Sequence, residues 1–270
     1  MTAPSSSRLR VTLVQIGAGQ NVQANLARLK QLVSGIGATD VIALPEVFAV
    51  RGSDQDYRSN AQSVSGPLAN FLVAIAHRHN AWVLAGSIIE ESDGRLFNTS
   101  ILLNRRGDVV ARYRKIHLFE AELESGQVIR ESDTYEAGDE PVMTDLEGWR
   151  VGMAICYDLR FPELFRRYSA QGAHLFFIPS NFTQRTGKDH WEILLRARAI
   201  ENQCFVVAPN QCGPNPHTGV DSYGNSMIVG PWGDVIQRIE EGDHAVTVML
   251  DSHDLTQTRQ RIPALAHRRL

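Results

Sequence analysis

Cysteine is scarce in this chain, and the positions of the cysteines argue against both a disulfide-stabilised domain and a zinc-stabilised domain. Among 270 residues only three are cysteines, Cys156, Cys204 and Cys212. Three thiols cannot form an even disulfide framework, and no Cys-x-x-Cys pair indicates a zinc site. Unpaired thiols are typical of a reducing compartment, so we expect the protein in the cytoplasm.

Long apolar runs and an excess of one charge are also missing. No segment approaches the roughly 20 apolar residues that span a bilayer, and the Ser-rich start leads into a run too short for a signal peptide. The net charge is −3 and the basic residues are spread along the chain, which argues against nucleic acid as the main partner. These features predict a soluble globular protein with no membrane and no nucleic-acid partner.

No low-complexity linker divides the chain, and strand-like runs alternate with helical patterns. Strands are predicted at residues 11–16, 41–44, 82–89, 151–155, 174–179, 205–209, 226–229 and 244–250, with a hairpin within 97–112. Helices are predicted at residues 21–34, 67–79, 162–171, 189–202 and 255–261. Most of these strands are apolar on both faces, as in a sheet covered by helices. We therefore predict one α/β domain over residues 1–270, with a C-terminal tail from about 251 to 270.

Two segments rich in turn-forming residues are predicted to be loops. Residues 213–219 contain proline, asparagine and glycine, and residues 52–57 begin with Gly52. Because ligand-binding residues are concentrated on loops, we expect both segments to shape a binding pocket.

Cys156 occupies the most informative position in the chain. It ends the apolar run 151–155, and Pro162 follows where a helix is predicted to begin. A nucleophile on such a strand-to-helix turn is lifted out of the sheet, with backbone N–H groups aimed at the oxyanion it creates. The alternative is that Cys156 is a small core residue.

Glu46 and Lys115 occupy two further positions that suit chemistry. Glu46 follows the predicted strand 41–44, at the end where open α/β sheets bind ligands, and a carboxylate there suits a general base. Lys115 follows the predicted hairpin and could place a positive charge near an oxyanion. Taken singly, each is better explained as a solvated surface residue. Only together with Cys156 do they favour catalysis.

Three segments resemble the Glu-Lys-Cys signatures of the nitrilase superfamily of carbon-nitrogen hydrolases. They are Leu44–Glu46, Tyr113–Leu118 and Ile155–Leu164, and they match in order and approximate spacing. The resemblance extends from Val11 to Arg269. It implies a four-layer αββα sandwich, which the family pairs into dimers, so we expect a homodimer or a higher homo-oligomer.

The same resemblance implies a role for each matching residue. Glu46 is implied as general base, Lys115 as oxyanion stabiliser, and Cys156 as the nucleophile that forms a thioester. The backbone N–H of Tyr157 would complete the oxyanion hole. This chemistry requires no metal and no organic cofactor, and its partner is a small-molecule amide.

A second glutamate of the family site matches Glu131. Its implied role is to orient Lys115 and the substrate. Glu122 and Glu124 are closer to Lys115 in sequence, so all three glutamates stay open for this role.

Shorter segments resemble the branch of the superfamily that contains deaminated glutathione amidase and ω-amidase. They are Glu131–Ser132, Thr186–Gly187, His190–Glu192, Arg196–Glu201 and the stretch from Gln203–Cys204 to Cys212–Gly213. Within the last of these, Gln211–Gly213 favours the first enzyme, whereas Lys188 and Pro209–Asn210 depart from the pattern of both. The implied reaction is hydrolysis of a small carboxylate-bearing amide, either deaminated glutathione or an ω-amide such as α-ketoglutaramate.

Arg160 is the candidate for binding the carboxylate of such a substrate. It lies four residues after Cys156, and its planar guanidinium can bind a carboxylate through two hydrogen bonds. A structural ion pair with Asp158 or Glu163 explains it equally well.

Two functions of other classes remain as alternatives. A nitrilase-fold scaffold protein without turnover is disfavoured, because it could lose one of the three catalytic residue types. A Cys/His peptidase requires a catalytic histidine, but no histidine here lies in a cysteine-protease context. We expect His117 and His190 to pack or to cap helices.

Overall fold

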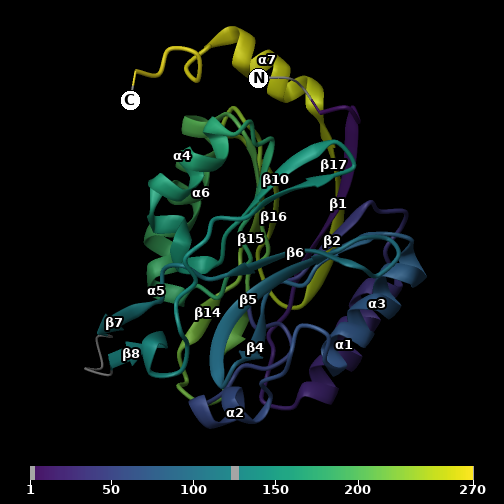
Figure 1. Ribbon diagram of the computed structural model, residues 1–270, viewed down its shortest axis with the longest axis vertical. Helices are drawn as coiled ribbons and strands as arrows, with labels where there is room; N and C mark the ends of the chain where they lie inside the picture. Colours follow the sequence, from purple (N-terminus) through teal and green to yellow (C-terminus); the bar gives the residue numbers. More distant parts are fainter. Residues whose placement is uncertain (1–3, 123–127, 270) are drawn as a thin grey trace.

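The computed structural model describes residues 4–122 and 128–269. Two β-sheets pack face to face and lie between two layers of helices, as Figure 1 shows. Helices α1 (Val22–Ser34) and α3 (Pro67–His79) cover one sheet, and α4 (Pro162–Ala170) and α6 (Glu192–Asn202) cover the other. The four-layer αββα sandwich is therefore confirmed.

The first sheet has seven strands and is built mainly from the N-terminal half. Its order is β17-β1-β2-β3-β5-β4, and β6 also pairs with β5. Strands β1, β2 and β3 are parallel, whereas the remaining pairs are antiparallel. The bounds are β1 Arg8–Gln15, β2 Val41–Ala43, β3 Trp82–Leu84, β4 Ile88–Ser92, β5 Arg95–Leu103, β6 Val109–Arg114 and β17 His244–Asp251.

The second sheet has six strands in the order β16-β15-β12-β11-β10-β9. Strands β10, β11 and β12 are parallel, so the loops after β10 and β11 leave the same edge of the sheet. The bounds are β9 Met143–Leu146, β10 Trp149–Met153, β11 Leu175–Phe177, β12 Phe205–Ala208, β15 Ser226–Val229 and β16 Val235–Ile239.

Strand β2 illustrates why the central strands are apolar on both faces. Successive side chains of a strand point to opposite faces. Val41 and Ala43 lie in the core between the sheets, whereas Ile42 and Leu44 lie in the core beneath α1 and α3. Strand β2 is thus buried on both faces, and Glu46 lies three residues after its end.

The smaller elements lie at the edges of the sandwich. They are α2 (Asp54–Ser59), α5 (Gln184–Thr186), α7 (Ser252–Arg261), the strand pairs β7 (Glu120–Glu122) with β8 (Val128–Arg130) and β13 (Cys212–Pro214) with β14 (Asp221–Tyr223), 3₁₀ turns at Glu131–Asp133 and Cys156–Arg160, and a π-helical turn at Gly187–Trp191. Within the described ranges, no helix combines the length and apolar character needed to cross a bilayer.

The single strand predicted at residues 82–89 is two strands, β3 and β4, separated at Gly86. Gly86 has a positive φ of 47°, and a Cβ there would lie 1.9 Å from the carbonyl oxygen of Pro45. Glycine therefore permits both the sharp change of direction and the close approach to the turn that carries Glu46. The hydroxyl of Ser87 then accepts the N–H of Val47 at 2.9 Å, which holds the same turn from its other side.

Three other segments also differ from their predicted form. The predicted loop 213–219 is the tip of the β13–β14 hairpin, and the predicted loop 52–57 contains the first residues of α2. Helix α2 begins after Ser53, which forms a capping box with Asp56. Helix α7 begins at Ser252, three residues before the predicted start, because Asp251 caps it.

Candidate active site

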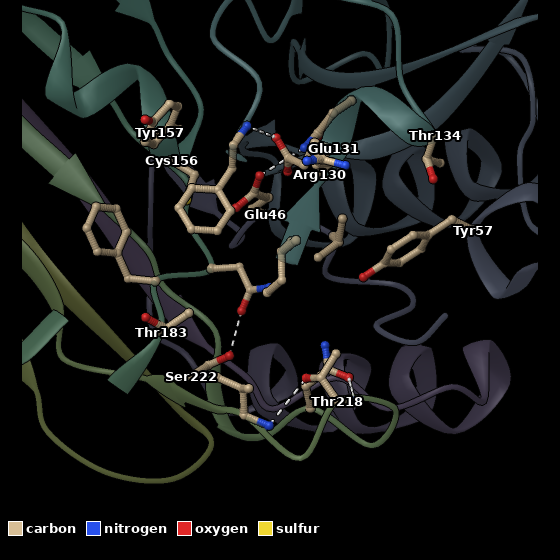
Figure 2. A pocket seen from close by; sticks show the side chains of 18 of the residues that line it. Glu46, Tyr57, Arg130, Glu131, Thr134, Cys156, Tyr157, Thr183, Thr218 and Ser222 are labelled. Carbon is tan, nitrogen blue, oxygen red and sulfur yellow. Dashed lines mark hydrogen bonds between the residues drawn. The ribbon is translucent and has the colours of Figure 1, made fainter. Parts of the chain in front are cut away.

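A cavity of about 250 Å³ opens between the ends of strands from both sheets. The predicted residues Glu46, Lys115, Glu131 and Cys156 all line it. Figure 2 shows Glu46, Glu131 and Cys156 close together on one side. The structure therefore brings together side chains from four distant stretches of the chain.

Glu46 and Lys115 are joined by a buried ion pair. Glu46 follows β2 and Lys115 follows β6, and both side chains are almost fully buried. The Lys115 ammonium donates to Glu46 Oε1 at 2.9 Å, and the side-chain amide of Asn98 donates to the same oxygen at 2.9 Å. Gln211 holds the backbone of Glu46 by donating to its carbonyl oxygen at 2.8 Å. The carboxylate is thus held rigidly at the floor of the cavity.

Glu131 is the second carboxylate on Lys115. Its side chain lies 2.8 Å from the lysine Nζ, and it also accepts the backbone N–H of Phe119 at 2.7 Å. Glu122 lies exposed on β7, away from the lysine, and Glu124 lies outside the described residues. Of the described glutamates left open by the sequence, Glu131 is therefore the one in contact with Lys115.

The two carboxylates determine the charge of Lys115. Burial alone lowers the pKa of a lysine, but the negative charges of Glu131 and Glu46 outweigh it and hold the pKa of Lys115 well above its ordinary value. Burial also raises the pKa of Glu131, which the positive charge of Lys115 opposes. Lys115 therefore supplies a fixed positive charge in the cavity.

Cys156 stands on a strained turn immediately after β10. Its φ is +47°, in the left-handed region that residues other than glycine rarely adopt. Its own N–H donates to the Pro179 carbonyl at 2.9 Å, and the N–H of Asp158 donates to Ile155 at 3.0 Å. Between them, the N–H of Tyr157 has no acceptor among the described residues. This free donor lies next to the thiol, at the position expected for an oxyanion contact.

The surroundings of Cys156 disfavour ionisation of its thiol. Burial raises the pKa of Cys156 well above its ordinary value, and the nearby negative charge of Glu46 raises it further. The charge of Lys115 and the backbone N–H of Asn181 act in the opposite direction. A neutral thiol beside a carboxylate needs that carboxylate to take its proton when it attacks.

Arg160 also lines the cavity, but it forms neither of the ion pairs considered for it. In the described part of the chain, no carboxylate pairs with this guanidinium, and Asp158 binds His117 instead. Arg160 lies near the rings of Tyr157 and Phe182, at 5.8 and 5.5 Å, and its Nη1 lies 3.3 Å from His190 Nδ1. The guanidinium is therefore positioned by two aromatic rings and by His190, and no described carboxylate occupies it.

Comparison with known proteins identifies the family. A model of the carbon-nitrogen hydrolase family matches residues 10–260. The chain belongs to the carbon-nitrogen hydrolase family. This hydrolase is 39% identical over 269 residues to the deaminated glutathione amidase of Yersinia enterocolitica, a match covering 96% of this chain and 92% of that protein. It is 38% identical over 271 residues to the mouse deaminated glutathione amidase, covering 96% and 83% of the two chains.

A solved structure supports the same assignment. Nit3 of Saccharomyces cerevisiae, described as a member of branch 10 of the nitrilase superfamily, superposes on this hydrolase with a TM-score of 0.85. The two are 29% identical, and the match covers 96% of this chain and 95% of Nit3. The resemblance stated from the sequence is confirmed at the level of family and fold.

Several residues that shape the site of this hydrolase were not among the predicted site residues. Asn98 and Asn181 are neutral amides outside every segment quoted for the family. Gln211 lies in the segment Gln211–Gly213, which was quoted for the branch without a role in the site. Asn98 left a further signal, because it begins a polar run inside an otherwise apolar strand. Within residues 4–122 and 128–269, no group of three or more His, Cys, Asp or Glu side chains is arranged to hold a metal ion.

Proposed function

We propose that this carbon-nitrogen hydrolase cleaves the amide of deaminated glutathione through a thioester on Cys156. The observation that carries the proposal is the convergence of Glu46, Lys115, Glu131 and Cys156 on one cavity. The substrate assignment is supported by relatives of that name at 38–39% identity over almost the whole chain.

Acylation begins when Cys156 attacks the carbonyl carbon of the amide. Glu46 takes the thiol proton as the sulfur–carbon bond forms, which avoids a free thiolate in a buried site. The carbonyl oxygen becomes an oxyanion, stabilised by the charge of Lys115 and by the N–H of Tyr157. The carbon–nitrogen bond then breaks, and the proton held by Glu46 passes to the departing amine.

Deacylation uses the same carboxylate again. A water molecule attacks the thioester carbon while Glu46 takes one of its protons. Collapse of the second tetrahedral intermediate breaks the carbon–sulfur bond, and the proton returns to the sulfur of Cys156. The products are the free acid and the amine, and the enzyme returns to its starting state.

Arg160 is proposed to select the acyl part of the substrate. Deaminated glutathione and α-ketoglutaramate both carry a carboxylate at the far end of a short acyl chain. A guanidinium that no acid of the described chain occupies can bind that carboxylate through two charge-assisted hydrogen bonds.

A substrate panel tests the proposed function. Purified protein is assayed with deaminated glutathione, α-ketoglutaramate and propionamide, and release of amine or ammonia is measured. We expect the highest kcat/KM on deaminated glutathione, and Cys156→Ala should abolish turnover while Cys204→Ala, a matched buried thiol, should retain it. A higher kcat/KM on α-ketoglutaramate would assign ω-amidase activity instead. Hydrolysis of none of the three would overturn the proposal.

A substitution at Arg160 tests carboxylate binding separately. Arg160→Met removes the charge but keeps an unbranched side chain. Because a charge-assisted hydrogen bond contributes about 1.5–3 kcal/mol, KM for deaminated glutathione should rise about 10- to 100-fold. Propionamide has no carboxylate, so its KM should not change. An equal effect on both amides would remove Arg160 from carboxylate recognition.

We also propose that the molecule is a homodimer in a reducing compartment such as the cytoplasm. Ile193, Ile200 and Trp232 expose apolar side chains on or beside α6, and all three cysteines are unpaired thiols. Light scattering of the purified protein measures the oligomeric state, and a monomer at micromolar concentration would contradict the first part.

A further inference from the structure

Asp158 is a buried carboxylate next to Cys156 in sequence, and the proposed reaction does not use it. It lies two residues after Cys156, and its side chain is fully buried. A buried carboxylate is costly unless donors surround it. Asp158 accepts four hydrogen bonds, two on each oxygen, from the groups of Tyr113, His117 and Ile155.

The donors come from two separate segments of the chain. The Tyr113 hydroxyl donates to Oδ2 at 2.7 Å, and the backbone N–H and Nδ1 of His117 lie 3.0 and 2.7 Å from Oδ1. Both residues flank Lys115. The backbone N–H of Ile155, directly before Cys156, donates to Oδ2 at 2.8 Å. One carboxylate thus holds the segments on either side of the ammonium and of the thiol.

This link joins the two sheets. Lys115 follows β6 in the first sheet, whereas Cys156 follows β10 in the second. Three hydrogen bonds run from residues 113–117 to residues 155–158, and all three end on Asp158. The ring of His117 also stacks on the ring of Phe161, with 3.7 Å between the ring centroids. This stacking is a further contact between the segment after β6 and the segment after β10. Because β6 and β10 belong to different sheets, strand pairing between them does not set the spacing of Lys115 and Cys156.

We propose that Asp158 is a positioning residue that sets the position of Lys115 relative to Cys156, so that the carbonyl oxygen of the substrate, which becomes an oxyanion when the sulfur attacks, lies near the ammonium. Asp158 does not touch the reacting atoms; it acts through the two segments that it joins. This role depends on the proposed function, because the oxyanion forms only in the proposed amidase reaction. The spacing between the Lys115 ammonium and the Cys156 thiol does not depend on that reaction.

Two substitutions test this role. Asp158→Asn keeps the shape but places an NH₂ group against a backbone N–H donor, that of His117 or that of Ile155, whichever way the amide is turned. Tyr113→Phe removes one bond between the segments and leaves the carboxylate paired with His117 and Ile155. The control is Thr12→Val, which removes a buried hydroxyl bonded to Thr39 and Thr247 in the first sheet.

The measurements separate positioning from folding. A displacement of about 1 Å at a reacting centre can reduce the rate about 100-fold. The value of kcat is divided by the fraction of molecules whose Cys156 can be alkylated. This corrected kcat should fall about 100-fold in Asp158→Asn and about 10-fold in Tyr113→Phe. KM should stay within about threefold, because substrate contacts are unchanged. Thr12→Val should lower the melting temperature without changing kcat.

Alkylation of Cys156 by iodoacetamide, located by mass spectrometry, provides a second readout that needs no amide substrate. Its rate should fall about 10-fold in both variants, since Lys115 favours the thiolate through its charge. Unchanged kcat and unchanged alkylation in folded Asp158→Asn, or in Tyr113→Phe if the first variant does not fold, would overturn the proposal. Slower alkylation without any amidase activity in the parent protein would support the positioning role and overturn the proposed function.

Discussion

At the scale of single residues, the site combines groups that are each unfavourable alone. Cys156 has a positive φ, and burial suppresses its ionisation. Lys115 is buried, yet two carboxylates keep it charged. Such strain and desolvation cluster at functional sites, where surrounding structure compensates for them.

The pair of glutamates around Lys115 yields a prediction at this scale. Glu131→Gln keeps the shape of the side chain but removes one of the two charges that hold the ammonium. We expect kcat to fall about 100-fold, because loss of one oriented electrostatic contact commonly costs this much. Glu122→Gln, on the exposed strand β7, is the matched control and should leave kcat unchanged. Equal activity of both variants would contradict the assignment of Glu131 as the second glutamate of the site.

At the scale of elements, the β13–β14 hairpin forms one wall of the cavity and depends on a buried arginine. Arg51 is 1% exposed and has no carboxylate partner in the described chain. Its guanidinium instead donates to the carbonyl oxygens of Ala18 and residues 212–214 and to the hydroxyl of Ser222. The Ser222 hydroxyl in turn donates to the side-chain oxygen of Asn181 at 2.6 Å, and the backbone N–H of Asn181 faces the thiol of Cys156.

Removing this guanidinium should loosen the hairpin. Arg51→Met leaves several buried acceptors without donors, so the free energy of unfolding should fall by about 3 kcal/mol or more. Because Thr218 and Ser222 line the cavity, KM should rise as well. Arg28→Met, which removes a half-exposed arginine paired with Asp243, should cost less than about 1 kcal/mol. Urea unfolding of both variants checks this, and similar losses would contradict the clamping role.

At the scale of the whole molecule, a network of ion pairs ties the two sheets together. Asp40, just before β2, binds Arg10 of β1 and Arg105 of the β5–β6 turn. Arg105 also pairs with Glu147 in the turn between β9 and β10 of the second sheet. The network therefore spans both halves of the sandwich.

Asp40 should make the stability of the fold sensitive to acid. Burial raises the pKa of Asp40, but hydrogen bonds from Arg10 and Arg105 outweigh it and lower the pKa to about 2. Because the unfolded pKa is about 3.9, the stabilisation is complete above that pH and is lost as the pH falls toward 2. Asp40→Asn should cost about 1–2 kcal/mol at pH 7, allowing for solvent screening, and much less near pH 2.

The control for this prediction is Asp108→Asn, which removes an exposed carboxylate paired with Arg106 in the same β5–β6 turn. It should change stability far less than Asp40→Asn at pH 7. Denaturant unfolding at pH 7 and at low pH gives both values. A loss for Asp40→Asn that does not depend on pH would contradict the assignment of the stabilisation to its charge.

Local patterns in the chain were sufficient for the family, the sandwich and three residues of the candidate site. Strands buried on both faces leave continuous apolar runs, and Glu46 and Cys156 come soon after such strands, whereas Lys115 follows β6, which is exposed on one face. Strand alternation and turn chemistry depend on neighbouring residues, so they can be read without coordinates.

The remaining features depend on packing between distant segments. Glu131 rather than Glu122 contacts Lys115, Arg160 lies beside aromatic rings and His190 rather than a carboxylate, and the segment 212–223 is a hairpin held by Arg51. None of these follows from nearby residues, because each contact forms only when two sheets, built from different halves of the chain, stack and bring their strand ends to one cavity.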